Sequence, residues 1–226
     1  MKELIAIFGL LTMTLFLPHL SLAAKDSPID QYIFGDFYQN AYHSLDAFLV
    51  KSRGNVEFVN GAHATTCAEY LEALKVSEVT DGVNNKMEEC PFTGCVIAAT
   101  MQRGKPHNGY RPKSYSQELE KRLDLRSFYN SLHLRFGKDT TKHTIADLKN
   151  PHVSLKDQYA VVIDEDDWFE RIGINSDADF NGNGKPDWLI SLFEKSIGGT
   201  LHDCNVFIVY DAEPTGLLKA SEVPRQ

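Results

Sequence analysis

The segment DADFNGNGKPDWLISLF, residues 177–193, joins an acidic, glycine-rich turn to a run of apolar residues. The apolar run, residues 187–193, is rich in the branched and aromatic side chains that favour β-strands. Two Asn-Gly dipeptides, at 181–182 and 183–184, favour left-handed backbone angles and commonly link the strands of a hairpin. The segment therefore predicts a turn that leads into a strand.

Similar apolar runs lie on both sides of this segment, at residues 159–163 and 205–210. Residues 168–174 supply a further candidate. Acidic residues or glycines separate these runs, and glycines at 198–199 lie between the runs at 187–193 and 205–210. This pattern predicts an antiparallel sheet in the last third of the chain.

The first part of the chain carries helix signals instead. Residues 28–51 have apolar spacing compatible with a helix. Thr66 and Glu69 stand at the positions of a capping box, which predicts a helix that starts at Cys67. A second capping signal precedes apolar residues spaced over 114–136, so we expect a longer helix there.

Charge is distributed unevenly between these parts. Residues 157–226 contain 14 acidic and 5 basic residues, whereas residues 1–156 contain 17 and 18. The sequence therefore predicts an α+β protein, with a helical N-terminal half followed by a small antiparallel sheet that carries the acidic metal-binding loop. The expected divisions are a signal peptide at 1–23, a mainly helical disulfide-containing region at 24–155 and an acidic β region at 156–226.

The N-terminus has the order of a secretory signal peptide. Lys2 precedes an apolar run of about 14 residues and then the small residues before Ala23 and Ala24, where cleavage is expected. A membrane-spanning helix needs about 20 apolar residues, and no later segment is apolar enough. The expected location is the periplasm or the extracellular space.

Four cysteines lie after the signal peptide, and an even number in an exported chain favours two disulfides over zinc ligation. Three pairings are open. In one, Cys90 bonds to Cys95 and closes a small loop, which leaves Cys67 to bond to Cys204. In the other two, Cys67 bonds to Cys90 or Cys95 within its own half, and Cys204 bonds to the cysteine that remains. The sequence does not choose between them.

Oxygen-bearing side chains recur at alternate positions of the loop. Counting from Asp179, they stand at positions 1, 3, 5 and 9, with glycine at position 6 and a backbone carbonyl, that of Lys185, at position 7. Calcium prefers six to eight oxygen ligands, which a short loop can supply in this way. A metal-free hairpin turn is the alternative, but it needs only one Asn-Gly pair.

The decapeptide DFNGNGKPDW resembles the DxDxDGxxD calcium loop of FG-GAP and integrin-type repeats, and more distantly dockerin and EF-hand loops. The resemblance covers about ten residues and implies one Ca²⁺ in a loop that connects two strands. Position 12, a glutamate in EF-hands, is Ile190, which argues against a helix-loop-helix. The implied ligands, with one upstream acid added for charge, are Asp177, Asp179, Asn181, Asn183, the carbonyl of Lys185, and Asp187.

Two carboxylates in this register predict weak binding, with a dissociation constant of about 10⁻⁴ to 10⁻³ M. Asp177 or one of the acids at 164–167 would supply the missing charge.

Catalytic motifs are not apparent: the chain has no GxSxG elbow, HExxH helix or phosphate-binding glycine loop. Residues 101–156 carry 12 basic and 5 acidic residues, which we interpret as a solvated or internally docked face rather than a nucleic-acid site. The favoured function is an exported calcium-binding protein, with the calcium structural, that binds an envelope or extracellular polymer or protein. The alternative is a secreted hydrolase of an envelope or host polymer.

Overall fold

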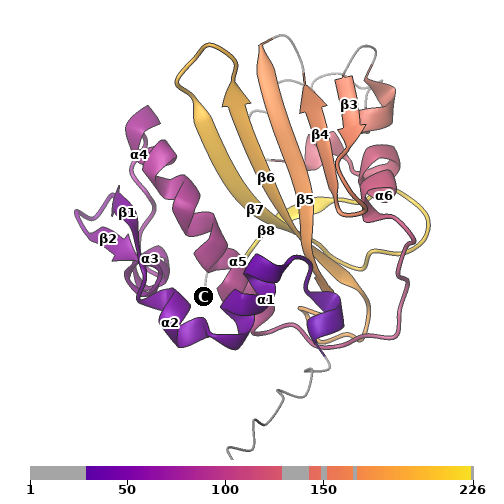
Figure 1. Ribbon diagram of the computed structural model, residues 1–226, viewed down its shortest axis with the longest axis horizontal. Helices are drawn as coiled ribbons and strands as arrows, with labels where there is room; N and C mark the ends of the chain where they lie inside the picture. Colours follow the sequence, from indigo (N-terminus) through magenta and orange to yellow (C-terminus); the bar gives the residue numbers. More distant parts are fainter. Residues whose placement is uncertain (1–28, 129–142, 149–151, 165–166, 225–226) are drawn as a thin grey trace, which may run out of the picture.

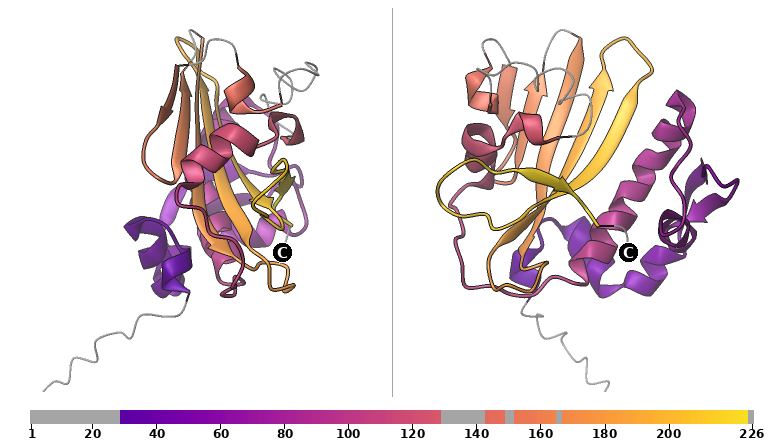
Figure 2. Two further views of the ribbon diagram at one scale, coloured as in Figure 1. Left: turned by 90° about the vertical axis from the view of Figure 1, so that its right-hand side faces the viewer. Right: turned by 180° about the vertical axis from the view of Figure 1, so that it is seen from behind.

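The computed structural model describes residues 29–128, 143–148, 152–164 and 167–224. The predicted signal peptide therefore lies outside the described residues. Within them the chain is α+β, as predicted: one six-stranded antiparallel sheet has helices against both of its faces (Figures 1 and 2).

The large sheet is a meander in which each strand pairs with the next strand along the chain. The predicted antiparallel strands are confirmed, and the sheet has an additional strand at each edge. The β6–β7 connection passes through Gly198, whose φ of 76° is left-handed. The strands are β3 (His152–Leu155), β4 (Ala160–Asp164), β5 (Trp168–Ala178), β6 (Asp187–Ser196), β7 (His202–Val209) and β8 (Ala220–Glu222).

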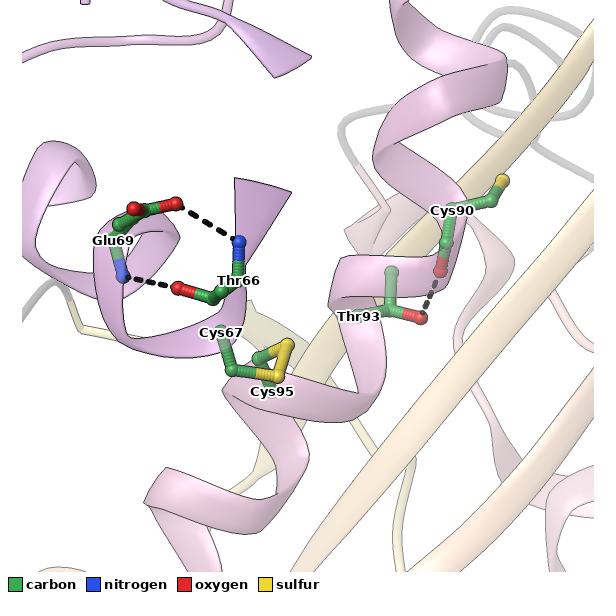
Figure 3. Close-up of a disulfide and its surroundings, with 6 residues drawn as sticks. All are labelled: Thr66, Cys67, Glu69, Cys90, Thr93 and Cys95. Atoms are coloured by element: carbon green, nitrogen blue, oxygen red, sulfur yellow. Dashed lines mark hydrogen bonds between the residues drawn. A yellow bond between two sulfur atoms is a disulfide. The ribbon is translucent and has the colours of Figure 1, made fainter. Parts of the chain in front are cut away.

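The N-terminal part contains short helices and a small hairpin. In residues 28–51, whose spacing is compatible with a helix, Gly35 has a φ of 87°, and a regular helix starts only after it. The capping box is confirmed: Thr66 Oγ1 accepts from Glu69 N, and the Glu69 carboxylate accepts from Thr66 N (Figure 3). The elements are η1 (Asp30–Tyr32), α1 (Asp36–His43), α2 (Leu45–Leu49), β1 (Ser52–Glu57), β2 (His63–Thr66), α3 (Cys67–Leu74), α4 (Val83–Glu89), η2 (Cys90–Phe92) and α5 (Thr93–Met101).

The helix predicted over 114–136 is shorter than expected. Helix α6 (Tyr115–Arg122) begins at the predicted Ser114 cap but ends where Leu123 pairs with Leu218 and Asp124 N donates to the Leu218 carbonyl. This tertiary pairing replaces the next helical turn. The chain continues as η3 (Leu125–Ser127), residues 129–136 lie outside the described part, and η4 (Ile145–Asp147) follows.

Two hydrophobic clusters hold the helices to the sheet, one on each face. The first places α6, η3 and η4 against Ile172, Ile190 and Phe207. The second places η1, α1 and α5 against Leu189 and Ile208 on the opposite face. Both clusters contain residues from before and after position 155, so the helical half and the sheet share their cores.

Two disulfides fasten the N-terminal region. Cys67–Cys95 joins α3 to α5 (Figure 3), and Cys90–Cys204 joins the end of α4 to β7. The observed pairing is therefore one of the two in which Cys67 bonds within its own half. The expected boundary after Leu155 falls at the end of β3, which pairs with β4 on the other side of that boundary. In the described ranges, no helix has the length and apolar character needed to cross a bilayer.

Candidate metal centre

The predicted calcium loop, residues 179–186, is the connection between β5 and β6. The two strands pair up to Ala178 and Asp187, so the loop closes an antiparallel hairpin. Gly182 and Gly184 have φ angles of 82° and 81°, which only glycine adopts without a steric penalty. A second chain segment supports the loop, because Lys105 forms a two-way backbone bridge with Asp179.

Asp179 organises the first half of the loop. Its residue is 4% exposed, and its carboxylate accepts hydrogen bonds from three backbone N–H groups: those of Gly182 at 2.6 Å, Asn183 at 3.2 Å and Gly184 at 2.9 Å. The chain is thereby wrapped around this carboxylate. The left-handed angles at both glycines turn the amide groups towards it.

Asp187 closes the loop from the start of β6 and is fully buried. Its carboxylate accepts from the backbone N–H groups of Phe180 at 2.8 Å, Asn181 at 3.3 Å and Asp211 at 2.9 Å. Burial raises the pKa of Asp187, the three backbone hydrogen bonds lower it, and the negative charge of Asp179 raises it further. Two negative groups therefore lie close enough to repel each other in a buried place.

The two asparagine side chains lie on the exposed side of the loop. Asn181 Oδ1 accepts from Asn183 N at 3.0 Å, and Asn183 Oδ1 accepts from Lys185 N at 2.8 Å. These are Asx turns, in which a side-chain oxygen holds the backbone two residues ahead.

Asp211 is a neighbour of the loop that the sequence did not reveal. It lies just after β7 with a φ of 52°, accepts from Asn183 Nδ2 at 2.7 Å, and has Lys185 Nζ at 3.6 Å. The hydrogen bond from Asn183 and the charge of Lys185 lower the pKa of Asp211. Lys185 Nζ also lies 3.2 Å from Glu213. The sequence did contain one signal for this position: Asp211 is an acidic residue just after β7, the strand that pairs with the start of β6.

The upstream acids proposed to supplement the loop are placed elsewhere. Asp177 is buried, and its carboxylate contacts His107 Nε2 at 2.9 Å, the Tyr115 hydroxyl at 2.5 Å and Arg111 Nε at 3.7 Å. Asp164 pairs with Phe169 near the start of β5, about 30 Å from the loop at the other end of that strand. The expectation that Asp164 or Asp167 supplies charge to the loop was therefore wrong, and residues 165–166 lie outside the described part.

His107 forms a buried pair with Asp177. Gly109 N donates to His107 Nδ1 at 3.1 Å, so Nε2 is the ring nitrogen that donates to Asp177. Both side chains are closed to solvent. The pair fastens the connection between α5 and α6 to the end of β5 and offers no open position for a substrate.

The donor set of the loop suits a hard cation. Asp179 and Asp187 supply carboxylates, the asparagines supply amide oxygens and Lys185 a carbonyl. Among the described residues, neither carboxylate has a lysine or arginine partner, and no three His, Cys, Asp or Glu side chains are grouped to hold a metal. A metal here would therefore depend on neutral oxygens for most of its ligands.

Comparison with known proteins gives no assignment. No family model matches the chain, and neither the curated proteins nor the solved structures contain a match.

Proposed function

We propose that this chain is an exported calcium-binding protein in which one Ca²⁺ occupies the β5–β6 loop in a structural role. The observation that carries the proposal is the pair of buried carboxylates, Asp179 and Asp187, which lack a cationic side-chain partner among the described residues. Three backbone N–H groups offset part of the cost of burying each carboxylate, but the two negative charges still repel each other. A divalent cation would offset both charges.

The expected ligands are the carboxylates of Asp179 and Asp187, the side-chain oxygens of Asn181 and Asn183, and the carbonyl of Lys185. When bound, calcium would replace amide N–H contacts on part of each carboxylate and fix the entry of β6. Asp211, held by Asn183, is placed to add a third carboxylate after its contact with Lys185 is released. This third charge would strengthen binding over that of the loop alone.

The wider role that we propose is that of a binding or interaction module in the cell envelope or outside the cell. Two disulfides are consistent with an oxidising compartment. The alternative of a secreted hydrolase has no specific support: the His107–Asp177 pair is closed to solvent, and all four cysteines are in disulfides.

Calorimetric titration of the full-length mature protein with CaCl₂ tests the metal proposal. We expect one site with a dissociation constant of about 10⁻⁴ to 10⁻³ M, or tighter if Asp211 takes part. Asp187→Asn and Asp179→Asn should each remove the heat of binding, whereas Asp164→Asn, an acid at the other end of the sheet, should leave it unchanged. Wild-type protein that gives no heat at several millimolar calcium, or heat that survives both loop variants, would refute the assignment.

A further inference from the structure

A polar group that lacks a partner lies at an irregularity in β5, away from the calcium loop. The pairing of β5 with β6 shifts between Ile174 and Ser176, so Asn175 is the extra residue of a β-bulge. Bulges commonly redirect a side chain next to a binding site. Asn175 is 4% exposed; its Oδ1 accepts from Ser191 Oγ at 3.3 Å, and its Nδ2 has no hydrogen-bond partner among the described residues.

Asn175 and Ser191 line a hollow of about 260 Å³. Its other walls carry the aromatic rings of Phe34, Tyr38 and Tyr159. A buried amide that lacks a partner costs free energy unless a ligand or water satisfies it. Nδ2 itself has almost no solvent-accessible surface, so it can donate to an acceptor in this hollow only after the Asn175 side chain turns towards it.

A larger hollow of about 540 Å³ lies next to the first and shares Phe34 and Tyr159 with it. The rings of these two residues are stacked, with centroids 4.3 Å apart. The second hollow is also lined by Tyr115 and by the amide side chains of Gln31, Gln39 and Gln158. Because the two hollows share these lining residues, we treat them together and call them the Phe34–Tyr159 groove.

Charges of both signs line this groove. The smaller hollow has Arg171 with Asp36 and Asp157, and the larger has Arg111 with Asp30. Arg111 already lies 3.7 Å from the carboxylate of Asp177, and Asp30 lies 2.9 Å from His43. Because basic and acidic side chains are mixed in both hollows, neither hollow has a surface of a single charge that would favour an anionic or a cationic ligand. The groove therefore suits a neutral ligand.

Aromatic faces combined with amide, hydroxyl and carboxylate groups match one chemical class well. A sugar ring presents apolar C–H faces that pack on aromatic rings, and hydroxyl groups that both donate and accept hydrogen bonds. Gln39 Nε2 already donates to the carbonyls of Asp30 and Ile33, and Gln158 Nε2 to the Tyr159 hydroxyl, so these two side chains offer a sugar hydroxyl group their amide oxygens as acceptors. Both hollows together have the size usual for small-ligand sites.

We infer that the Phe34–Tyr159 groove binds a neutral carbohydrate, with sugar residues on both sides of the ring pair. The Asn175 side chain would turn towards the groove on binding, so that Nδ2 donates to a sugar oxygen. This inference gives the proposed binding module its ligand class, and in that respect it rests on the proposed function. It does not depend on calcium, because no residue of the groove belongs to the β5–β6 loop.

Gly173 gives a test that does not remove a polar group. It lies on β5 without a left-handed φ, and a Cβ there would meet Ser191 Oγ at 3.7 Å and Ala160 Cβ at 3.9 Å, which are ordinary contacts. Gly173→Ala should therefore fold and place a methyl group in the smaller hollow. Asn205 on β7 is the matched control for Asn175, because its Nδ2 also lacks a partner among the described residues but it lines a different hollow.

The experiment is an NMR titration of the ¹⁵N-labelled mature protein with maltotetraose, cellotetraose and chitotetraose at millimolar concentrations. We expect at least one of them to bind and to shift the side-chain amide signals of Asn175. Asn175→Ala should weaken binding about three- to tenfold, for the loss of one hydrogen bond, and Gly173→Ala about tenfold, for the lost space. Asn205→Ala should leave the affinity unchanged.

No binding of any of the three sugars would overturn the inference, as would binding that survives both Asn175→Ala and Gly173→Ala. Repeating the titration on Asp179→Asn separates the two proposals. Sugar binding in that variant together with loss of calcium heat supports both, whereas sugar binding by a wild-type protein that takes up no calcium leaves the groove assigned and removes only the metal.

Discussion

Individual acidic residues in this protein differ in what compensates their burial. Asp177 is compensated by a tyrosine hydroxyl, a histidine and an arginine, whereas Asp187 has only backbone N–H groups among the described residues. Backbone N–H groups carry partial charges, so they offset a carboxylate less completely than a cation does. We propose that this difference separates Asp177, a structural acid, from Asp187, a metal ligand.

Glu89 is a third case, at the end of α4. Burial raises the pKa of Glu89, and the charge of Asp203 raises it further, while the hydrogen bond from the Tyr70 hydroxyl at 2.6 Å and the charge of Lys86 lower it. A carboxyl group whose pKa is higher in the folded state binds its proton more tightly there than in the unfolded chain. Its ionisation therefore lowers stability as the pH rises from the ordinary range of glutamate, about 4.3, through the raised folded value.

Glu89→Gln keeps an acceptor for Tyr70 and removes the charge. We expect the free energy of unfolding of this variant, relative to wild type, to be higher at pH 7 than at pH 4, as measured by urea denaturation at the two pH values. Asp203→Asn should reduce the difference, because it removes one cause of the raised pKa of Glu89. If the free energy of unfolding of the variant relative to wild type is the same at both pH values, or higher at pH 4, the raised pKa of Glu89 is contradicted.

Among the elements, the β5–β6 hairpin depends on two left-handed residues. A Cβ at Gly184 would meet no atom within 4 Å, so the penalty for a side chain there comes from the backbone alone. Gly184→Ala should lower the free energy of unfolding by about 1–2 kcal/mol. Gly184→Asn should cost less, because asparagine tolerates this conformation. Denaturant unfolding of both variants checks this, and an equal loss for both would show that backbone strain is not the cause.

The two disulfides are elements of different span. Cys67–Cys95 is separated by 28 residues and Cys90–Cys204 by 114. Loop-closure entropy predicts that replacing both members of the longer bridge by alanine costs about 5 kcal/mol and of the shorter about 3.5 kcal/mol. Denaturant unfolding of the two double variants should show this order. A larger loss for the shorter bridge would show that local packing, and not chain entropy, dominates.

The sequence predicted elements whose signals are local and missed those that depend on distant segments. Residues close together in the sequence determine the helix caps at Thr66 and Ser114 and the two strands of the hairpin. By contrast, α6 ends early because Leu218 pairs with the chain there, 95 residues away from Leu123. The disulfide pairing was left open for the same reason.

For the whole molecule, the composition change near residue 155 predicted a change of secondary structure, and the structure joins the two parts in shared cores. The loop residues from Asp179 to Asp187 were predicted to lie together because one hairpin holds them. Asp211 and the Phe34–Tyr159 groove were not predicted, because each is assembled from segments far apart in the chain. Their positions follow only from the order of the strands and the packing of α1 and α6.

The most direct test of the central claim is a crystal structure of the mature protein grown with calcium, with anomalous diffraction used to locate the ion. We predict one peak about 2.3–2.6 Å from carboxylate oxygens of Asp179 and Asp187 and from the carbonyl of Lys185. A loop without a peak at calcium concentrations well above millimolar, in which both carboxylates keep only their backbone N–H partners, would contradict the account.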